Sequence, residues 1–483
     1  MHPTLSPGVE RRVRDARALL ERREALREAT RRLRFDTIAV HGMYGVEEAF
    51  TGGQGGIVEP IMPSTSQAYR DSDEMEAALA YLIPSWCYSR IHNPTVFYLE
   101  ETLALLESHG VPVRASALCT ASGMAAIKQA VEPLVSLLRG RKANFVSSAQ
   151  VYGGTFQLFD VRMRERGAEV RWVTEPWSIE SWAALVDDDT RFLYMEMPSN
   201  PQQSCCDLQA VADLAHRHGV PFIVDATIAT PALMRPLAHG ADVVVHSLTK
   251  TVGSGGAAVG GVVIARENLV SRHLEDDARV DYASWLKLWP FRDSGPCMSP
   301  YSAFALLSDL RLLRLKVQWM SANTMKVARF LARHPRVQQV DYLGLPEHPL
   351  HAMAARVMQL VDADVPSPTF GHLLSFTVRG TAQDTRVFFD GLRRIYRATD
   401  LGRVKSVATI PAISTHQQQG EEGRRLAGIS PNMVRLCVGA EHPDDVIEDL
   451  DQALGRLEHR TTRAAGAPMN GGPEDGRPAP AHG

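Results

Sequence analysis

The chain has 483 residues, of which 45% are hydrophobic and 22% are charged, a composition typical of a soluble globular protein with two or three domains. Its formal net charge of −3 provides no excess of Lys and Arg for binding nucleic acid. No apolar stretch approaches the ~18 residues of a membrane span, and no secretion signal begins the chain. Six scattered cysteines without a C-x-x-C pair fit a reduced compartment and argue against a zinc site. We therefore expect a cytoplasmic protein without metal, nucleic-acid or membrane partners.

The two ends of the chain differ in composition from the rest. Residues 8–34 are dense in Arg and Glu, which predicts an exposed helix stabilised by acid–base pairs within an N-terminal extension of residues 1–36. Its acidic residues argue against a mitochondrial transit peptide. Gly, Pro and Ala dominate after about Thr461, so residues 461–483 are predicted to form a disordered tail.

Strand and helix patterns alternate through the middle of the chain. The predicted strands cover residues 144–148, 169–173, 191–196, 223–225 and 243–245, and the predicted helices cover residues 95–108, 207–218 and a segment that begins near residue 122. This alternation predicts an α/β domain with a mostly parallel sheet flanked by helices, and a ligand site at the carboxyl ends of its strands.

The pattern changes after Ser299. One long helix is predicted over residues 303–334, strands over 372–378 and 433–438, and a closing helix over 443–457. These elements predict a smaller C-terminal α+β domain.

Polar residues end two of the strands in the larger domain. Asp225 ends one strand, and Ser247, Thr249 and Lys250 follow another. A lysine at the mouth of an apolar strand loses hydration, and its amine can then act as a nucleophile. An Asp and a Lys on neighbouring strands could hold a pyridinium nitrogen and form a Schiff base, as pyridoxal 5'-phosphate (PLP) requires. Each residue alone is equally typical of a solvated loop or a helix cap.

The whole string around the lysine carries a family resemblance. It reads Val224-Asp225-Ala-Thr227…Thr230-Pro231…Pro236-Leu237…Gly240-Ala-Asp242…His246-Ser247-Leu-Thr249-Lys250. It resembles the Cys/Met-metabolism PLP enzymes, which include cystathionine γ-synthase, cystathionine γ-lyase and methionine γ-lyase. The resemblance implies fold type I of the PLP-dependent transferases. It also implies a subunit-contact segment (37–98), a large PLP-binding domain (99–298) and a C-terminal domain (299–460).

The resemblance also assigns residues around the cofactor. Tyr88 and Arg90, in Tyr88-Ser-Arg90-Ile-His-Asn-Pro, would reach across a dimer to the cofactor phosphate, which a guanidinium fork matches. Tyr152 would stack on the pyridine and protonate the leaving group. The other expected cofactor contacts are the phosphate cradle of Ser122, Gly123 and Met124, the asparagine Asn200 at the cofactor's phenolic oxygen, and Asp225, Ser247, Thr249 and Lys250.

Substrate contacts are expected from the C-terminal domain. Arg435, in Met433-Val-Arg435-Leu-Cys-Val-Gly439, would clamp the substrate α-carboxylate, with a surface strand arginine as the alternative. The loop Asp400-Leu-Gly402-Arg-Val-Lys405-Ser406 aligns with a family loop that reads Gly-Gly-x-Glu-Ser. It keeps Ser406 but has Lys405 in place of the glutamate. A lysine there would repel the distal ammonium of cystathionine at a cost on the order of 1–4 kcal/mol.

These features predict γ-elimination or γ-replacement on an L-amino acid with a Cγ leaving group. Departures from the family at Gly154, Ala226, Thr251 and Lys405 favour a substrate other than cystathionine, such as a non-proteinogenic amino acid of specialised metabolism. The alternatives are a housekeeping transsulfuration enzyme (cystathionine γ-synthase, γ/β-lyase or O-acylhomoserine sulfhydrylase) and a non-catalytic PLP-binding regulator. We expect a homo-oligomer, and a dimer of dimers by resemblance.

Overall fold

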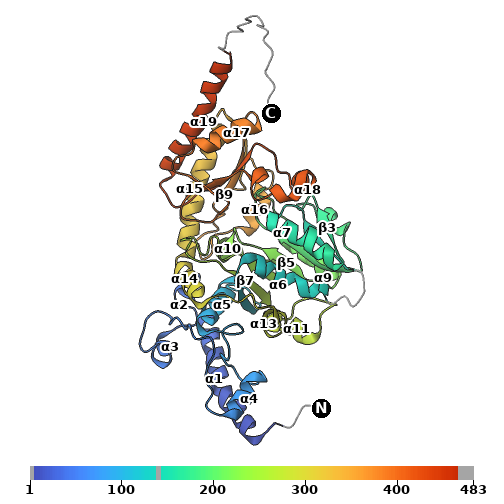
Figure 1. Ribbon diagram of the computed structural model, residues 1–483, viewed down its shortest axis with the longest axis vertical. Helices are drawn as coiled ribbons and strands as arrows, with labels where there is room; N and C mark the ends of the chain where they lie inside the picture. The colour runs from blue at the N-terminus through green and yellow to red at the C-terminus, as the bar shows by residue number, and fades with distance from the viewer. Residues whose placement is uncertain (1–4, 137–142, 466–483) are drawn as a thin grey trace, which may run out of the picture.

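The computed structural model describes residues 5–136 and 143–465. Figure 1 shows a large α/β domain in the middle of an elongated molecule, with α1 (Pro7–Arg31) at one end and α19 (Pro443–Ala465) at the other. The helix α19 continues four residues past Thr461, where the tail was expected to begin, and residues 466–483 of that tail lie outside the described part. No helix in the described ranges has both the length and the apolarity to cross a bilayer.

The large domain is built on a seven-stranded sheet in the order β1-β7-β6-β5-β4-β2-β3. Its strands are β1 (Ala115–Thr120), β2 (Ala143–Ser148), β3 (Ala168–Val173), β4 (Thr190–Glu196), β5 (Phe222–Asp225), β6 (Val243–His246) and β7 (Gly261–Arg266). Only the pairings that involve β7 are antiparallel, so the sheet is mostly parallel, as predicted. The sequence patterns did not predict β1 or β7.

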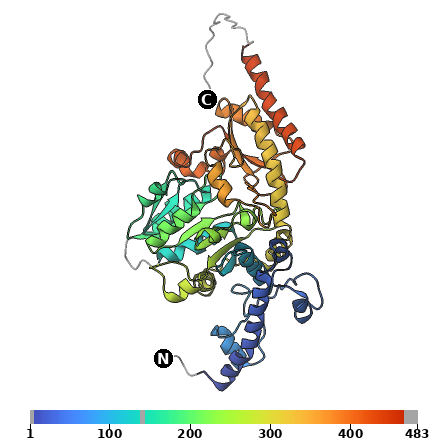
Figure 2. The same ribbon diagram turned by 180° about the vertical axis from the view of Figure 1, so that it is seen from behind.

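Side chains from successive strand positions enter apolar cores on opposite faces of the sheet, as the pleat requires. Ile223 and Val243 pack on the side of α6 (Gly123–Ser136), whereas Val224 and Val244 pack on the side of α5 (Pro94–Glu107) and α9 (Leu208–Arg217). The result is a three-layer domain, and Figure 2 shows its sheet from behind. The other helices of the domain are α7 (Gly153–Gln157), α8 (Ile179–Ala183), α10 (Thr230–Leu233), α11 (Asp276–Val280), α12 (Tyr282–Leu286) and α13 (Arg292–Ser294).

The long helix predicted over residues 303–334 is two helices, α14 (Pro300–Leu310) and α15 (Leu313–Arg333). Leu312 leaves the helical conformation between them. The Lys316 amine donates a hydrogen bond to the Asp309 carbonyl at 2.7 Å, which satisfies a backbone group near the end of α14. The apolar pattern continues across the break because both helices bury leucines, so periodicity did not reveal it.

The C-terminal domain contains a second sheet in the order β10-β11-β12-β9-β8. Its strands are β8 (Val337–Asp341), β9 (Leu373–Val378), β10 (Tyr396–Arg397), β11 (Val407–Thr409) and β12 (Met433–Cys437). Its helices include α16 (His351–Val357), α17 (Ala382–Gly391), α18 (Gly420–Leu426) and α19. Arg435 lies on β12, between Thr409 of β11 and Ser375 of β9.

The N-terminal segment is less regular. After α1 it contains α2 (Phe35–His41), α3 (Val46–Thr51) and α4 (Ser72–Leu79). The predicted exposed helix is α1, and it is fixed to the large domain through arginines. Arg31 donates hydrogen bonds to the carbonyls of Val111 and Val113, both at 2.7 Å. These contacts satisfy carbonyls of the chain that leads into β1.

Candidate active site

A cavity of about 200 Å³ opens at the carboxyl ends of the parallel strands, where the C-terminal domain meets the large domain. This is the expected position for a ligand site in such a sheet. It brings together most of the residues that the sequence singled out. They are Ser122, Gly123, Met124, Tyr152, Asn200, Asp225, Ser247, Thr249, Lys250 and Arg435.

Asp225 presents a carboxylate at the end of β5 that is only 7% exposed. One oxygen accepts hydrogen bonds from the backbone and hydroxyl of Thr227, at 3.0 and 2.6 Å. The other oxygen has only a long contact, 3.5 Å, with the Tyr194 hydroxyl. Burial raises the pKa of Asp225 despite the bonds from Thr227. This buried, incompletely satisfied oxygen is suited to a cationic N–H donor such as a pyridinium.

Glu196, at the end of β4, is a site residue that the sequence reasoning missed. Its two oxygens accept hydrogen bonds from the backbone N–H groups of Tyr152, at 2.7 Å, and Asn200, at 2.8 Å. Burial and the nearby Asp225 raise the pKa of Glu196 well above its usual range. Glu196 thereby fixes the backbone of two residues that line the cavity. The only sequence signal was its place directly before the strand-end turn.

Lys250 is not free in the cavity. Its amine donates a hydrogen bond to Asp400 Oδ1 at 2.7 Å, and the other Asp400 oxygen accepts one from Arg403 Nε. Asp400 and Arg403 lie in the loop that aligns with the family pattern, but that pattern predicted no role for either residue. The sequence signal for this pair was an acidic and a basic residue that flank Leu401 and Gly402.

Arg435 is 2% exposed and lies where Asn200 can orient it. Its guanidinium donates to Asn200 Oδ1 at 3.1 Å and to the carbonyls of Asp400 and Thr399 at 2.8 and 3.3 Å. Burial lowers the pKa of Arg435, although several neighbours favour the cation. A fixed, buried guanidinium that lines a cavity is suited to a carboxylate ligand.

The opposite end of the cavity is formed by backbone groups and small side chains. A Cβ at Gly123 would lie 2.5 Å from the Ser247 Cβ, so only glycine lets the start of α6 approach the turn after β6 this closely. The start of a helix, with exposed N–H groups and nearby hydroxyls, is suited to a phosphate. Together with Asp225, Lys250 and the Tyr152 ring, these groups match the pyridinium, aldehyde and phosphate of PLP. The residues present therefore fit this cofactor.

Tyr88 and Arg90 are exposed and do not line the cavity of their own chain. They lie together, with the Arg90 guanidinium carbon 5.3 Å from the centre of the Tyr88 ring. Arg90 also donates a hydrogen bond to the carbonyl of Arg292. Their predicted contact with a cofactor phosphate therefore stays a prediction that needs a second subunit.

The two other expected substrate contacts, Lys405 and Ser406, also lie outside the cavity lining. Lys405 is exposed, with its amine 5.2 Å from the centre of the Tyr396 ring. Ser406 is only 1% exposed, and its hydroxyl donates to Glu441 and accepts from the Gly439 N–H. Since the Lys405 amine is directed toward solvent and an aromatic ring, the structure does not support the expected repulsion of a distal ammonium.

Two other departures from the family pattern also point away from the cavity. Ala226 is fully buried in the core between the sheet and the α5–α9 layer. Thr251 is also fully buried, and its hydroxyl is 3.3 Å from His372 Nε2 of the C-terminal domain. Gly154 is different, because a Cβ there would lie 2.6 Å from the Tyr152 ring. Of these departures, Gly154 alone affects a cavity side chain directly.

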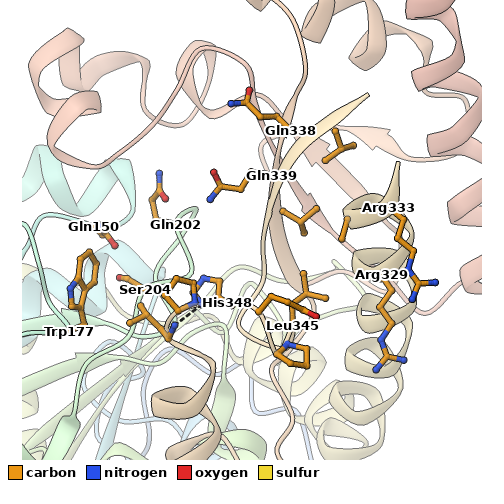
Figure 3. A pocket seen from close by; sticks show the side chains of 17 residues that line it. Gln150, Trp177, Gln202, Ser204, Arg329, Arg333, Gln338, Gln339, Leu345 and His348 are labelled. Atoms are coloured by element: carbon orange, nitrogen blue, oxygen red, sulfur yellow. Dashed lines mark hydrogen bonds between the residues drawn. The ribbon is translucent and has the colours of Figure 1, made fainter. Parts of the chain in front are cut away.

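A larger hollow of about 1200 Å³ lies between the two domains, and Figure 3 shows the residues that line it. Gln150, Trp177 and Gln202 come from the large domain, whereas Gln338 and Gln339 come from β8. Its lining combines neutral amides with Arg329, Arg333 and Glu347, and its His348 is already bonded to Asp341 at 2.7 Å, but it holds neither of the strand-end residues Asp225 and Lys250. We therefore identify the smaller cavity as the candidate active site because of the residues that line it, although the other hollow is larger.

Comparison with known proteins agrees with this site. The sequence profile described as "Cys/Met metabolism PLP-dependent enzyme" matches residues 36–455. The chain is 33% identical to an O-acetyl-L-homoserine sulfhydrylase of Leptospira meyeri, over 87% of this chain and 97% of the relative. It is 34% identical to an O-succinylhomoserine sulfhydrylase of Pseudomonas aeruginosa, over 88% of this chain and 96% of the relative.

A solved structure of a putative O-acetylhomoserine (thiol)-lyase from Campylobacter jejuni superposes with a TM-score of 0.77 at 30% identity. The match covers 88% of this chain and 100% of that one, which contains a pyridoxyl-lysine phosphate. The chain belongs to the Cys/Met metabolism PLP-dependent enzyme family. It has fold type I, uses PLP and acts on γ-substituted amino acids, which confirms the family, fold, enzyme class and cofactor predicted from sequence.

Proposed function

We propose that this protein is an O-acylhomoserine sulfhydrylase, which replaces the acyloxy group on Cγ with sulfide or a thiol. The observation that carries the proposal is the match to sulfhydrylases over nearly their whole length. This is one of the housekeeping alternatives from the sequence analysis. The comparisons favour it over the specialised substrate that was the first prediction. The three departures that point away from the cavity, at Ala226, Thr251 and Lys405, also do not support that first prediction.

The cavity residues have distinct roles in such a replacement. The Arg435 guanidinium binds the α-carboxylate of the substrate, because it is buried and aligned by Asn200. When bound, PLP acts as an electron sink that makes the α- and β-protons of an amino acid acidic. The Lys250 amine moves those protons, and the Tyr152 phenol donates a hydrogen bond to the departing carboxylate. An acyl substituent leaves as a carboxylate anion, and sulfide forms the new bond at Cγ.

We also propose that the active unit is at least a dimer. Large apolar side chains of the irregular N-terminal segment are mostly exposed, including Val46 at 78%, Phe50 at 76% and Ile57 at 94%. Such a concentration marks a protein contact surface. Tyr88 and Arg90 lie in the same segment, so a second copy of this chain bound to the segment could receive their side chains at its cofactor.

The test is a product assay on the purified protein. O-acetyl- or O-succinyl-L-homoserine with sulfide should yield homocysteine, at a kcat/KM at least roughly tenfold above that for cystathionine cleavage. Arg435→Lys should raise KM roughly 10–100-fold, because a single ammonium cannot reproduce the bidentate contact. Faster turnover of cystathionine, or a cofactor spectrum that no amino acid changes, would refute the proposal. The second outcome would favour the non-catalytic regulator.

A further inference from the structure

The turn that precedes β11 lies against the lysine turn of the large domain. Gly402 has a φ of +74°, and a Cβ there would lie 2.5 Å from the Thr251 N–H nitrogen. This close approach requires glycine, and it places Asp400, two residues earlier, beside the Lys250 amine at 2.7 Å. The backbone of the C-terminal domain therefore determines the position of this carboxylate.

Two further hydrogen bonds hold Asp400 in that orientation, and a third fixes the arginine that makes one of them. Arg403 donates to one of its oxygens and donates again to the Gly253 carbonyl at 2.8 Å. The Leu401 N–H donates to the other oxygen at 2.9 Å. The guanidinium of Arg403 thus joins the Asp400 loop to the glycine run after Lys250. The carboxylate is in place before any ligand binds.

We infer that Asp400 is a positioning residue for Lys250: it holds the Lys250 amine in place by a hydrogen bond whenever that amine is not bonded to the cofactor. The inference uses PLP binding, a family property, and does not depend on the proposed sulfhydrylase activity. Lys250 would then have two positions, one on the cofactor and one on Asp400. An amine held in this way stays beside the substrate after displacement and is not lost to solvent.

The charges around the pair are consistent with this role. Burial alone would raise the pKa of Asp400, but the hydrogen bonds and charges of Lys250 and Arg403 outweigh burial and lower it. Asp400 therefore stays ionised at neutral pH, and its carboxylate can accept the hydrogen bond from the Lys250 amine. The other titratable or charged groups that face this part of the cavity are Arg435, Tyr152, Glu196 and Asp225.

The experiment measures the reactivity of the Lys250 amine itself. The full-length, cofactor-free protein is treated with the acetyl ester of N-hydroxysuccinimide over a range of pH, and acetylation at Lys250 is followed by peptide mass spectrometry. Only the neutral amine reacts. Asp400→Asn removes the ion pair that occupies the Lys250 amine, so the acetylation rate at neutral pH should rise about tenfold. Asp400→Glu should keep the rate within about twofold of the unmodified protein.

Controls separate this role from a general effect on folding. Glu100→Gln breaks another partly buried ion pair, Lys287–Glu100 at 2.5 Å, and should leave the Lys250 acetylation rate unchanged. Added PLP must block acetylation at Lys250 in each protein, which shows that the cavity is intact. If Asp400→Asn does not fold, Asp400→Ser has the same expected result. An unchanged acetylation rate in the PLP-binding Asp400→Asn variant would overturn the inference, whatever substrate the enzyme uses.

Discussion

At the scale of single residues, Glu196 should make stability depend on pH. Its pKa lies well above the usual 4.5, because of burial first and Asp225 second. The folded protein thus keeps a proton that the unfolded chain has lost. The resulting stability is complete below about pH 4.5 and is lost as pH rises toward the raised folded pKa. Melting temperatures of the cofactor-free protein should therefore fall over this window, and Glu196→Gln should flatten the decline.

A matched control for this prediction is Glu421→Gln, which removes an exposed carboxylate of α18. It should retain the decline of the unmodified protein. Parallel curves for the unmodified protein and Glu196→Gln would contradict the expectation.

The position of a site residue could be predicted from sequence where the residue directly follows a strand. Asp225 and Lys250 each follow an apolar run, so their position at the carboxyl edge of the sheet could be predicted. Glu196 and Asp400 could not, because their roles depend on partners 44 and 150 residues away in the sequence. Lys405 shows the limit of an aligned loop, because its position in the chain did not determine the direction of its side chain, and its contact with a substrate stays a prediction.

At the scale of elements, two adjacent glycines at the start of α7 should have different functions. A Cβ at Gly153 would lie 1.9 Å from the Thr415 carbonyl oxygen, whereas one at Gly154 would meet the Tyr152 ring at 2.6 Å. Gly153→Ala must displace the backbone of the C-terminal domain and should destabilise the protein by about 1–3 kcal/mol. Gly154→Ala should leave the melting temperature nearly unchanged but lower kcat roughly tenfold or more, by displacing Tyr152.

Thermal melting and steady-state kinetics on both variants check this pair. Equal losses of stability in the two variants would show that the ring of Tyr152 does not move to accommodate a side chain at residue 154.

Helices and strands were predicted correctly where the spacing of apolar residues followed a single helical or strand pattern. The β-branched run of β6 and the leucine spacing of α5 identified each correctly. The antiparallel β7 follows a glycine-rich loop and was missed, although it pairs with both β1 and β6. The break between α14 and α15 was missed because apolar residues continue through it. The spacing of apolar residues along the sequence indicates which side chains are buried, but it does not indicate where the backbone changes direction.

At the scale of the whole molecule, the site described so far lacks the two residues expected at the phosphate. Tyr88 and Arg90 are exposed on an N-terminal segment that also exposes large apolar side chains such as Phe50 and Ile57. If two copies exchange these segments, each cofactor has Lys250 from one subunit and Arg90 from the other. A closed two-fold dimer would then contain two such shared sites.

Mixing inactive variants tests this arrangement directly. Arg90→Ala and Lys250→Ala should each abolish nearly all activity alone, while light scattering shows that both remain oligomeric. When they are co-expressed, a hybrid dimer contains one site with both native residues and one with neither. Random pairing makes half of the dimers hybrids, so about a quarter of the native activity should return. If Arg90 instead serves the Lys250 of its own chain, every site carries one defect and no activity returns.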